Sequence, residues 1–541
     1  MADNHHVKTA QKLADQAIQD KLGLDAFQEA KQATEEEHAQ TLKQALRENR
    51  KAVIWSMAIS MCIIMEGYDT ILIGNFFAYP EFQKKFGHYY PELGKWQVSG
   101  PWQTGLTMAA TCGAIIGGLA NGWFASRLGY RKVLMAAMMA LNCFLFIVFF
   151  ATGREMLLAG QVLCGLCWGV FATLAPAYAS EVCPTNLRGY MTTYVNLCWA
   201  IGQLLAAGVL RGCLHIHGEM GYRIPFALQW MWPTPIIVLA WFAPESPWFL
   251  VRSDRLEEAK HSIHRLSGDK TEAQINAQLA MMLHTTTVES QVSKGATYLD
   301  CFRGVNIRRS EICMLAFVGQ ILSGSSFAYT PTYFFTSAGM ESARAFEMGL
   351  GAKAFGFIGT VCSWFLITRF GRRTLYVSGL GCLFIILFII GILNVAAHDR
   401  ALWPSGALCV VWLFVYSLTI GPVTYSIISE TSSVRLRPLA VVLARNAYQV
   451  VNIISIVLQT YMMNPTEWNL QGKTGFVWGS TCFCMFVWSF FRMPEVKGRT
   501  YEELDILFKH KVPARKFAST EVDAYGERSA EPEVKEEQAT K

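Results

Sequence analysis

The chain has 541 residues, of which 52% are hydrophobic and only 16% are charged. Soluble proteins carry about 25% charged residues, so this composition is more apolar than a soluble core requires. The net charge of +6 is modest for so long a chain, and it gives no reason to expect a nucleic-acid partner.

The apolar residues are gathered into long blocks separated by short polar segments. A helix that crosses a bilayer needs roughly 20 mostly apolar residues. The blocks predict an all-α membrane protein, in contact with the lipid bilayer, with twelve transmembrane helices at residues 53–77, 103–124, 133–152, 156–178, 192–211, 224–243, 311–335, 349–368, 375–396, 406–429, 439–463 and 474–492.

The positions of Lys and Arg predict the orientation of these spans. With both termini in the cytoplasm, roughly three quarters of the basic residues fall in cytoplasmic tails and loops, and the opposite topology inverts that ratio. Lys353 and Arg445 lie within spans. The predicted organisation is a cytoplasmic tail at 1–52, a six-helix half at 53–243, a cytoplasmic linker with short helices at 244–310, a second six-helix half at 311–492 and a cytoplasmic tail at 493–541.

Three motifs occur twice, once in each half. SRLGYRK at Ser126 returns as TRFGRRT at Thr368, SEVCPTNLRG at Ser180 returns as SETSSVRLRP at Ser429, and PES at Pro244 returns as PEV at Pro494. The offsets lie between 242 and 250 residues, and each motif follows the same span of its half. Two parallel six-helix repeats indicate an alternating-access carrier with a substrate site between the halves.

These motifs resemble those of the sugar porter family of the major facilitator superfamily. The resemblance rests on GYDT at 67–70, PESPWFLVR at 244–252, GPVTYSIISE at 421–430 and PEVKGRTYEELD at 494–505. Longer stretches, such as EGYDTILIGNF from Glu66, are similar to fungal maltose and α-glucoside proton symporters. The resemblance implies plasma-membrane uptake of a sugar with H⁺ by a monomeric carrier without a cofactor. A disaccharide is expected, either maltose or another α-glucoside, or lactose or cellobiose.

The resemblance also assigns the charged residues of the repeated motifs to a cytoplasmic gate. In the family the arginines pair with the acids in one state and release them in the other. The alternative role is charge that sets topology and contacts lipid headgroups. The residues concerned are Arg127, Arg131, Glu181, Arg188, Glu245, Arg369, Arg372, Arg373, Glu430, Arg437 and Glu495.

Ionisable side chains within spans are costly and mark functional positions. Glu66 and Asp69 are three residues apart on one helix face, where burial and mutual repulsion both oppose ionisation. The resemblance makes Asp69 the proton carrier. Gln161 stands where the proton-coupled relatives commonly have an Arg, so Arg445 is a candidate partner of Asp69 or Glu66. The alternatives are a structural acid for Glu66, and snorkelling or helix bracing for Arg445.

Carried over by position, the sugar contacts of the family fall on amides, hydroxyls and aromatic rings, which are the groups that recognise sugars. For each residue the alternative role is a hydrogen bond between helices. The predicted substrate-binding residues are Gln161, Asn196, Gln203, Gln320, Ser325, Tyr425, Asn446, Tyr448, Gln449 and Asn452.

The sequence contains no motif that indicates an enzyme, a metal site or a nucleotide-driven pump. Two other functions compete with proton-coupled uptake. A facilitative sugar uniporter does not need Asp69. A non-transporting sugar sensor typically carries a long cytoplasmic tail, and the tail after the last predicted span has only 49 residues.

Overall fold

The computed structural model describes residues 42–521 and 535–536, apart from residues 93, 269, 294–296, 330, 338, 397–401, 433–435 and 498–500. Within this part of the chain, twelve helical stretches are long and apolar enough to span a membrane, which confirms the predicted number. They run over Arg50–Phe76, Gly100–Leu128, Tyr130–Phe149, Arg154–Val182, Thr193–Cys213, Met220–Phe242, Asn306–Thr336, Ser342–Ile367, Arg372–Ala396, Trp403–Ile428, Leu439–Met463 and Gln471–Arg492.

The helices extend beyond the predicted apolar blocks at several ends. The eighth span begins at Ser342 rather than at residue 349, because the polar turns of residues 342–348 continue the same helix. Sequence hydropathy marks the apolar part of a helix, whereas its backbone hydrogen bonds continue into polar turns. Most of the N-terminal tail, residues 1–41, lies outside the described part of the chain.

The chain forms two compact units, each described here by itself. The first unit comprises Met1–Ile73, Gly105–Val209 and His215–Gly295. Its helices are α3 (Leu42–Glu48), α4 (Arg50–Ser60), α5 (Cys62–Phe76), α7 (Gly100–Leu128), α8 (Tyr130–Phe149), α9 (Arg154–Val182), α10 (Thr185–Cys213), α11 (Met220–Ala227), η1 (Leu228–Met231), α12 (Pro233–Phe242), α13 (Pro247–Arg252), α14 (Leu256–Leu266) and α15 (Glu272–Ser293), whose ends in part extend into the second unit.

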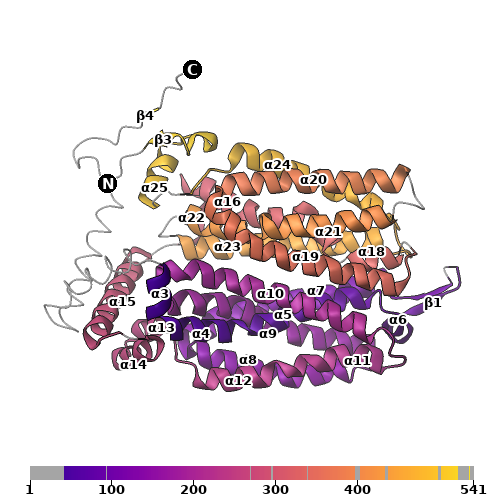
Figure 1. Ribbon diagram of the computed structural model, residues 1–541, viewed down its shortest axis with the longest axis horizontal. Coiled ribbons are helices and arrows are strands. Elements are labelled where there is room, and N and C mark those ends of the chain that lie inside the picture. The colour runs from indigo at the N-terminus through magenta and orange to yellow at the C-terminus, as the bar shows by residue number, and fades with distance from the viewer. Residues whose placement is uncertain are drawn as a thin grey trace. The chain divides into compact units, whose positions relative to one another are not determined.

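The second unit comprises Gly74–Thr104, Leu210–Leu214 and Ala296–Lys541. Its elements are α6 (Pro80–Phe86), β1 (His88–Tyr90), β2 (Lys95–Gln97), η2 (Tyr298–Phe302), α16 (Asn306–Gln320), η3 (Ile321–Ser325), α17 (Ser326–Ala328), α18 (Pro331–Ser337), α19 (Ser342–Arg369), α20 (Arg372–Ala396), α21 (Leu402–Leu418), α22 (Ile420–Thr431), α23 (Arg437–Met463), η5 (Gln471–Lys473), α24 (Thr474–Arg492), α25 (Tyr501–Lys509), η6 (Ala514–Lys516), β3 (Thr520–Glu521) and β4 (Lys535–Glu536). Figure 1 labels most of these elements.

The segment between the first two spans therefore packs with helices from the second half of the sequence. Gln97 and Gln103 both donate side-chain hydrogen bonds to the hydroxyl of Tyr333 in α18, at 2.8 and 3.1 Å. The amide of Asn464 donates to the carbonyl of Val98 at 3.2 Å. The same segment forms the antiparallel hairpin β1–β2, a small exception to the predicted all-α fold (Figure 1).

In the first unit, α7 and α9 approach each other through glycines on both helices. A Cβ atom at Gly117 would collide with the carbonyl of Leu166, and one at Gly169 would collide with the carbonyl of Ala114. Small residues at such spacing let two helix backbones come into contact, which is how membrane helices gain packing energy without a hydrophobic driving force. The glycines thus fix α9, which carries part of the candidate site.

In the second unit, the seventh span is broken. The π-helical segment η3 contains Gly324 at φ 92°, a conformation that glycine adopts without steric cost, and α18 begins at Pro331. The span is therefore built from α16, η3, α17 and α18 rather than from one continuous helix. A buried core in this unit packs residues such as Trp412, Tyr376 and Phe327.

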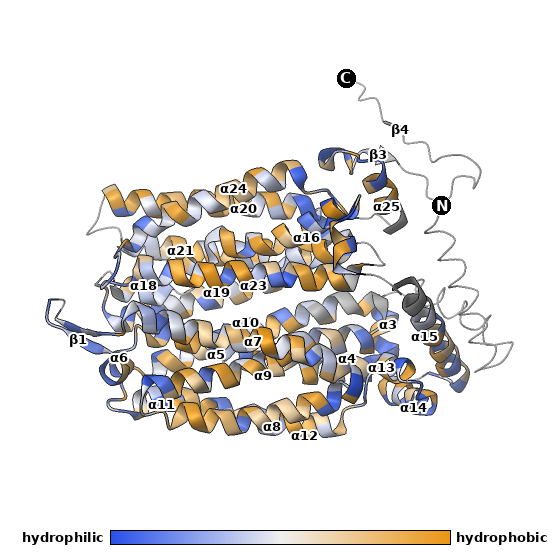
Figure 2. Ribbon diagram, turned by 180° about the vertical axis from the view of Figure 1, so that it is seen from behind, coloured by the Kyte–Doolittle hydropathy of each residue, from blue (hydrophilic) through white to orange (hydrophobic). Residues whose placement is uncertain are grey.

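The linker after the sixth span forms short helices with their own core. Phe249, Ile263 and Leu279 of α13, α14 and α15 pack together there. Figure 2 shows hydrophobic residues along the spans and many hydrophilic residues in α14 and α15. α14 covers most of the polar segment from Asp254 to Lys260.

Candidate transport site

The most deeply buried acid among the predicted site residues is Asp69 in α5, with 4% of its surface exposed. Two neutral groups hold its carboxylate. The indole Nε1 of Trp168 donates to Oδ2 at 3.0 Å, and Nε2 of Gln229 donates to Oδ1 at 2.9 Å. Among the described residues, no basic side chain hydrogen-bonds to Asp69. The carboxylate is thus stabilised by dipoles rather than by an opposite charge.

Three local features bring these groups together. Gly67 lets α5 lie against the backbone of Trp199 in α10, where a Cβ atom would collide with the Trp199 carbonyl. Trp168 projects from α9, which the glycine contacts with α7 hold in place. Gln229 lies in the 3₁₀ turn η1, between the Pro-containing helix α11 and the start of α12 at Pro233. Pro225 within α11 and Pro233 at the start of α12 flank the turn that carries Gln229.

Sequence reasoning found Asp69 but missed both of its partners. Neither Trp168 nor Gln229 is predicted from the sequence as a partner of Asp69. The sequence offers one weak signal for Gln229. Its amide follows a proline within a predicted span, in the stretch YRIPFALQW, and is therefore expected to be buried. Such an amide needs partners, and the sequence does not identify them.

Gln161 is 1% exposed, and neither atom of its amide has a hydrogen-bond partner within the described part of the chain. It lies three residues before Cys164 and seven before Trp168, so the three share one face of α9. The thiol of Cys164 lies near Asp69, so this face of α9 points toward that acid. Gln161 therefore presents an unused donor and acceptor on the Asp69 side of its helix.

Glu66, the second predicted acid of the first span, is half-buried one turn before Asp69. Its backbone carbonyl accepts a hydrogen bond from the hydroxyl of Thr70 at 2.8 Å. Arg445 lies in α23 of the second unit, with its guanidinium carbon 4.8 Å from the ring centroid of Tyr448 and 5.7 Å from that of Phe317. The pairing of Arg445 with Asp69 or Glu66 stays a prediction.

The predicted sugar-binding residues fall into one group in each unit. In the first unit, Asn196 is half-buried and Gln203 is buried with its Nε2 unpartnered among the described residues. Both project from α10. Their seven-residue spacing places them on one face of that helix.

In the second unit, Gln320 donates its Nε2 to the carbonyl of Gly421 at 3.0 Å. Ser325 is buried in η3, directly after the glycine that breaks the span. Tyr425 is 50% exposed, and its ring meets that of Phe317 edge to face at 5.3 Å. Tyr448, Gln449 and Asn452 are half-buried on α23, where Asn446 is exposed.

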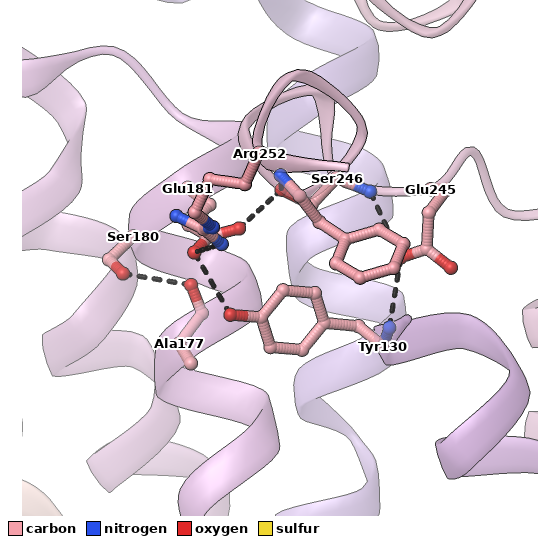
Figure 3. Close-up of polar contacts among 8 residues, drawn as sticks. Tyr130, Ala177, Ser180, Glu181, Glu245, Ser246 and Arg252 are labelled. Carbon is pink, nitrogen blue, oxygen red and sulfur yellow. Dashed lines mark hydrogen bonds and ion pairs between the residues drawn. The ribbon is translucent and has the colours of Figure 1, made fainter. Parts of the chain in front are cut away.

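The acids of the repeated motifs bind partners within their own unit. In the first unit (Figure 3), Glu181 accepts hydrogen bonds from Arg252 at 2.5 Å, from the hydroxyl of Tyr130 at 2.9 Å and from Ser246. Glu245 accepts from the backbone N–H groups of Tyr130 and Arg131 at the start of α8. Burial raises the pKa of Glu245, and the backbone donors lower it in part.

The second unit repeats this pattern, with the arginine supplied by the motif that begins at Thr368. Arg372 donates to Glu430 at 3.0 Å, and the backbone N–H groups of Arg372 and Arg373 donate to Glu495 at 2.8 and 3.1 Å. A helix N-terminus is a natural site for a carboxylate, so Glu245 and Glu495 play the same local role in the two repeats.

The remaining members of the predicted gate have other contacts. Arg127 stacks on Trp123 at 4.3 Å, and the carbonyl of Arg369 accepts from Lys497 at 2.9 Å. The side chains of Arg188 and Arg437 lie outside the described part of the structure.

Within the described part of the chain, no group of three or more His, Cys, Asp or Glu is placed to hold a metal ion.

Twelve candidate spans, repeated motifs and a buried carboxylate between neutral donors define a multi-pass membrane transporter. Residues 55–508 match the family model described as "Sugar (and other) transporter", and the chain belongs to this family.

Relatives and solved structures agree with this assignment. The chain is 41% identical to maltose permease MAL31 of Saccharomyces cerevisiae, over 93% of this chain and 83% of the permease. It is 40% identical to a general alpha-glucoside permease of the same organism, over 93% of this chain and 82% of that protein.

Among solved structures, the proton:xylose symporter XylE bound to 6-bromo-6-deoxy-D-glucose has a TM-score of 0.68 at 20% identity, covering 85% of this chain and all of that one. A partially occluded inward-open conformation of XylE from E. coli has a TM-score of 0.65 at 18% identity, covering 83% of this chain and 99% of that one. At this level of identity the likeness shows the major facilitator fold.

Proposed function

We propose that this protein imports an α-glucoside disaccharide such as maltose together with a proton, by alternating access across the plasma membrane. The permeases that are about 40% identical to it carry maltose and α-glucosides in their names. The observation that carries the proton part is Asp69, a buried carboxylate held by Trp168 and Gln229 alone among the described residues. An acid at this depth without a fixed cation is suited to bind and release a proton.

The two partners of Asp69 suit both of its protonation states. When Asp69 is ionised, both N–H donors stabilise it. When it is protonated, its O–H needs an acceptor, and the Oε1 atom of Gln229 has no hydrogen-bond partner within the described residues. A rotation of the Gln229 amide would present that oxygen, whereas the indole of Trp168 can only donate. Proton binding at Asp69 therefore requires the rotation of one side chain rather than the movement of a helix.

Sugar recognition is assigned to the two groups of polar residues described above. The unpartnered amide atoms of Gln161 and Gln203 are costly when buried without water or a ligand. Sugar hydroxyls both donate and accept hydrogen bonds, so they satisfy such amides. Tyr425 adds a half-exposed aromatic face suited to the apolar side of a sugar ring.

The charged motifs are assigned to the cytoplasmic ends of the helices. We place both chain termini in the cytoplasm on the distribution of Lys and Arg, and we expect a monomer. The pairs Arg372–Glu430 and Arg252–Glu181 would fix these ends within each unit. Alternating access would then move units whose cytoplasmic ends are internally braced.

The test is the movement of protons with the sugar. Adding maltose to energy-depleted yeast cells that express this protein and lack other sugar carriers should alkalinise the medium. Asp69→Asn should abolish accumulation against a gradient while maltose exchange continues, because a permanently neutral side chain cannot release a proton. Maltose uptake without alkalinisation, or accumulation that Asp69→Asn leaves intact, would favour a facilitative uniporter instead.

A further inference from the structure

A second ionisable group lies deep within a span, and the proton site does not use it. Lys353 in α19 is 5% exposed. Among the described residues, it forms no ion pair with a carboxylate. Its Nζ instead interacts with both the backbone and the ring of Tyr329 in the broken seventh span. A buried cation of this kind is expensive in a membrane protein and marks a position with a function.

Lys353 contacts Tyr329 in two ways. Its Nζ donates to the Tyr329 carbonyl at 2.7 Å, and it lies 3.8 Å from the centroid of the Tyr329 ring. Tyr329 directly follows α17, where the helix ends before α18 begins at Pro331. Carbonyl groups at a helix end lack the donors that a continuing helix supplies, and they carry the negative end of the helix dipole.

Broken helices in transporters commonly use such carbonyl groups to coordinate a coupling cation. In this chain the ammonium of Lys353 lies at the break and is covalently attached to the neighbouring span. It is a cation that cannot dissociate.

The helix that carries Lys353 packs tightly against α18, which begins two residues after Tyr329. Gly349 lies one turn before Lys353 on α19, and a Cβ atom there would collide with the hydroxyl of Thr332 in α18. α18 and α19 are also in contact along their length. The position of α18 and the end of α17 therefore depends on the surface that α19 presents.

Tyr329 connects this contact to the predicted sugar site. Its ring meets that of Tyr416 edge to face at 5.9 Å, and Tyr416 stacks on Trp412 at 5.1 Å. The phenols of Tyr425 and Tyr448, two predicted sugar contacts, lie near that of Tyr416. Moving Tyr329 would disturb this group of aromatic side chains.

We propose that Lys353 is a positioning residue for the substrate. Its Nζ group holds the chain between α17 and α18 and the ring of Tyr329, and so maintains the aromatic side of the sugar site in the second unit. The inference rests on the proposed function, since it concerns the binding of the same sugar.

Lys353→Met tests the role of the charge with little change in side-chain volume. Replacing a buried charge by an apolar residue is often neutral or stabilising, so a purely structural lysine predicts an unchanged KM and an unchanged or higher melting temperature. The proposal predicts that the KM for labelled maltose in proteoliposomes rises about tenfold, while Vmax per reconstituted carrier stays within about twofold. Lys353→Arg, which keeps the charge, should recover part of the affinity.

A double-mutant cycle tests whether Lys353 affects sugar binding through the ring of Tyr329. Tyr329→Phe keeps the ring and the backbone carbonyl and should leave the effect of Lys353→Met intact. In a Tyr329→Leu background, Lys353→Met should change KM less than about twofold, because the ring through which Lys353 acts on the sugar site is already absent. Additive effects, or a normal KM in Lys353→Met alone, would overturn the inference. Absence of saturable maltose uptake by the unmodified protein is a different result, and it would overturn the proposed function itself together with this inference.

Discussion

The residues around Asp69 show how neutral groups replace a cation at a candidate proton site. The sequence predicts no basic partner for Asp69 on α9, because position 161 is a glutamine. The structure supplies Trp168 and Gln229 instead. A hydrogen bond to a charged group contributes about 1.5–3 kcal/mol, so two such bonds partly offset the cost of burying the ionised acid.

Gln229→Leu should uncouple proton release from sugar movement. The variant leaves Asp69 with Trp168 as its only described donor and removes the oxygen that would accept from the protonated acid. Loss of about 1.5–3 kcal/mol from the ionised state should lower concentrative maltose uptake by roughly tenfold or more while exchange persists. Accumulation and exchange assays on the same vesicles would measure this.

Gln161→Leu is the matched control for Gln229→Leu. Gln161 is an amide on the same side of the site, and it has no hydrogen bond to Asp69. The Gln161→Leu variant should raise the KM for maltose, while maltose uptake stays coupled to proton movement. Equal losses of accumulation and exchange in Gln229→Leu would contradict the specific role of that amide.

At the scale of elements, glycines determine which helices can carry the site. Gly67 and Gly202 allow α5 and α10 to lie in backbone contact, and Gly117 and Gly169 do the same for α7 and α9. These two pairs of helices are so close that a methyl group does not fit between them. They position the buried groups of the site. In the seventh span a glycine has a different effect. Gly324 adopts a non-helical conformation and interrupts the helix.

Gly169→Ala should destabilise the first unit. Its Cβ would collide with the Ala114 carbonyl, and such overpacking typically costs about 1–3 kcal/mol. Gly122→Ala on α7 is the control, because nothing lies within 4 Å of a Cβ there. Melting temperatures of the purified proteins in detergent should fall for Gly169→Ala and stay level or rise slightly for Gly122→Ala. The same temperature for both variants would show that this helix contact does not limit stability.

At the scale of the whole molecule, the two repeats share a charge pattern that has consequences for stability. Burial raises the pKa of Glu430, and the nearby Arg372 lowers it only in part. Since the folded protein then holds this proton more tightly than the unfolded chain, ionised Glu430 costs stability above the ordinary carboxyl pKa of about 4.3. The cost disappears as the pH falls.

Glu430→Gln should therefore change the pH dependence of the melting temperature. As the pH falls from about 7 toward the ordinary carboxyl range, the unmodified protein should gain stability relative to this uncharged variant, because Glu430 takes up its proton. Differential scanning fluorimetry at several pH values in one detergent measures the difference. A relative loss of stability on acidification would mean that the attraction of Arg372 outweighs burial.

The two compact units also depart from a simple division of the sequence into halves. Residues Gly74–Thr104 belong to the second unit, where Gln97 and Gln103 bond to Tyr333 of α18. Hydropathy and motif repeats cannot predict this, because they describe each span and not the loops between spans. The twelve spans themselves were predictable, since their length and apolar character are local properties of the chain.

The sequence by itself determined the number of spans, the repeat, the family and the buried acid, because each depends on local composition or on a motif that recurs. Only the tertiary structure decided which groups meet. The partners of Asp69 are 99 and 160 residues away along the chain, and Lys353 meets a carbonyl that becomes available only because another helix breaks. Periodicity shows that a side chain is buried, whereas its neighbours depend on how distant helices pack.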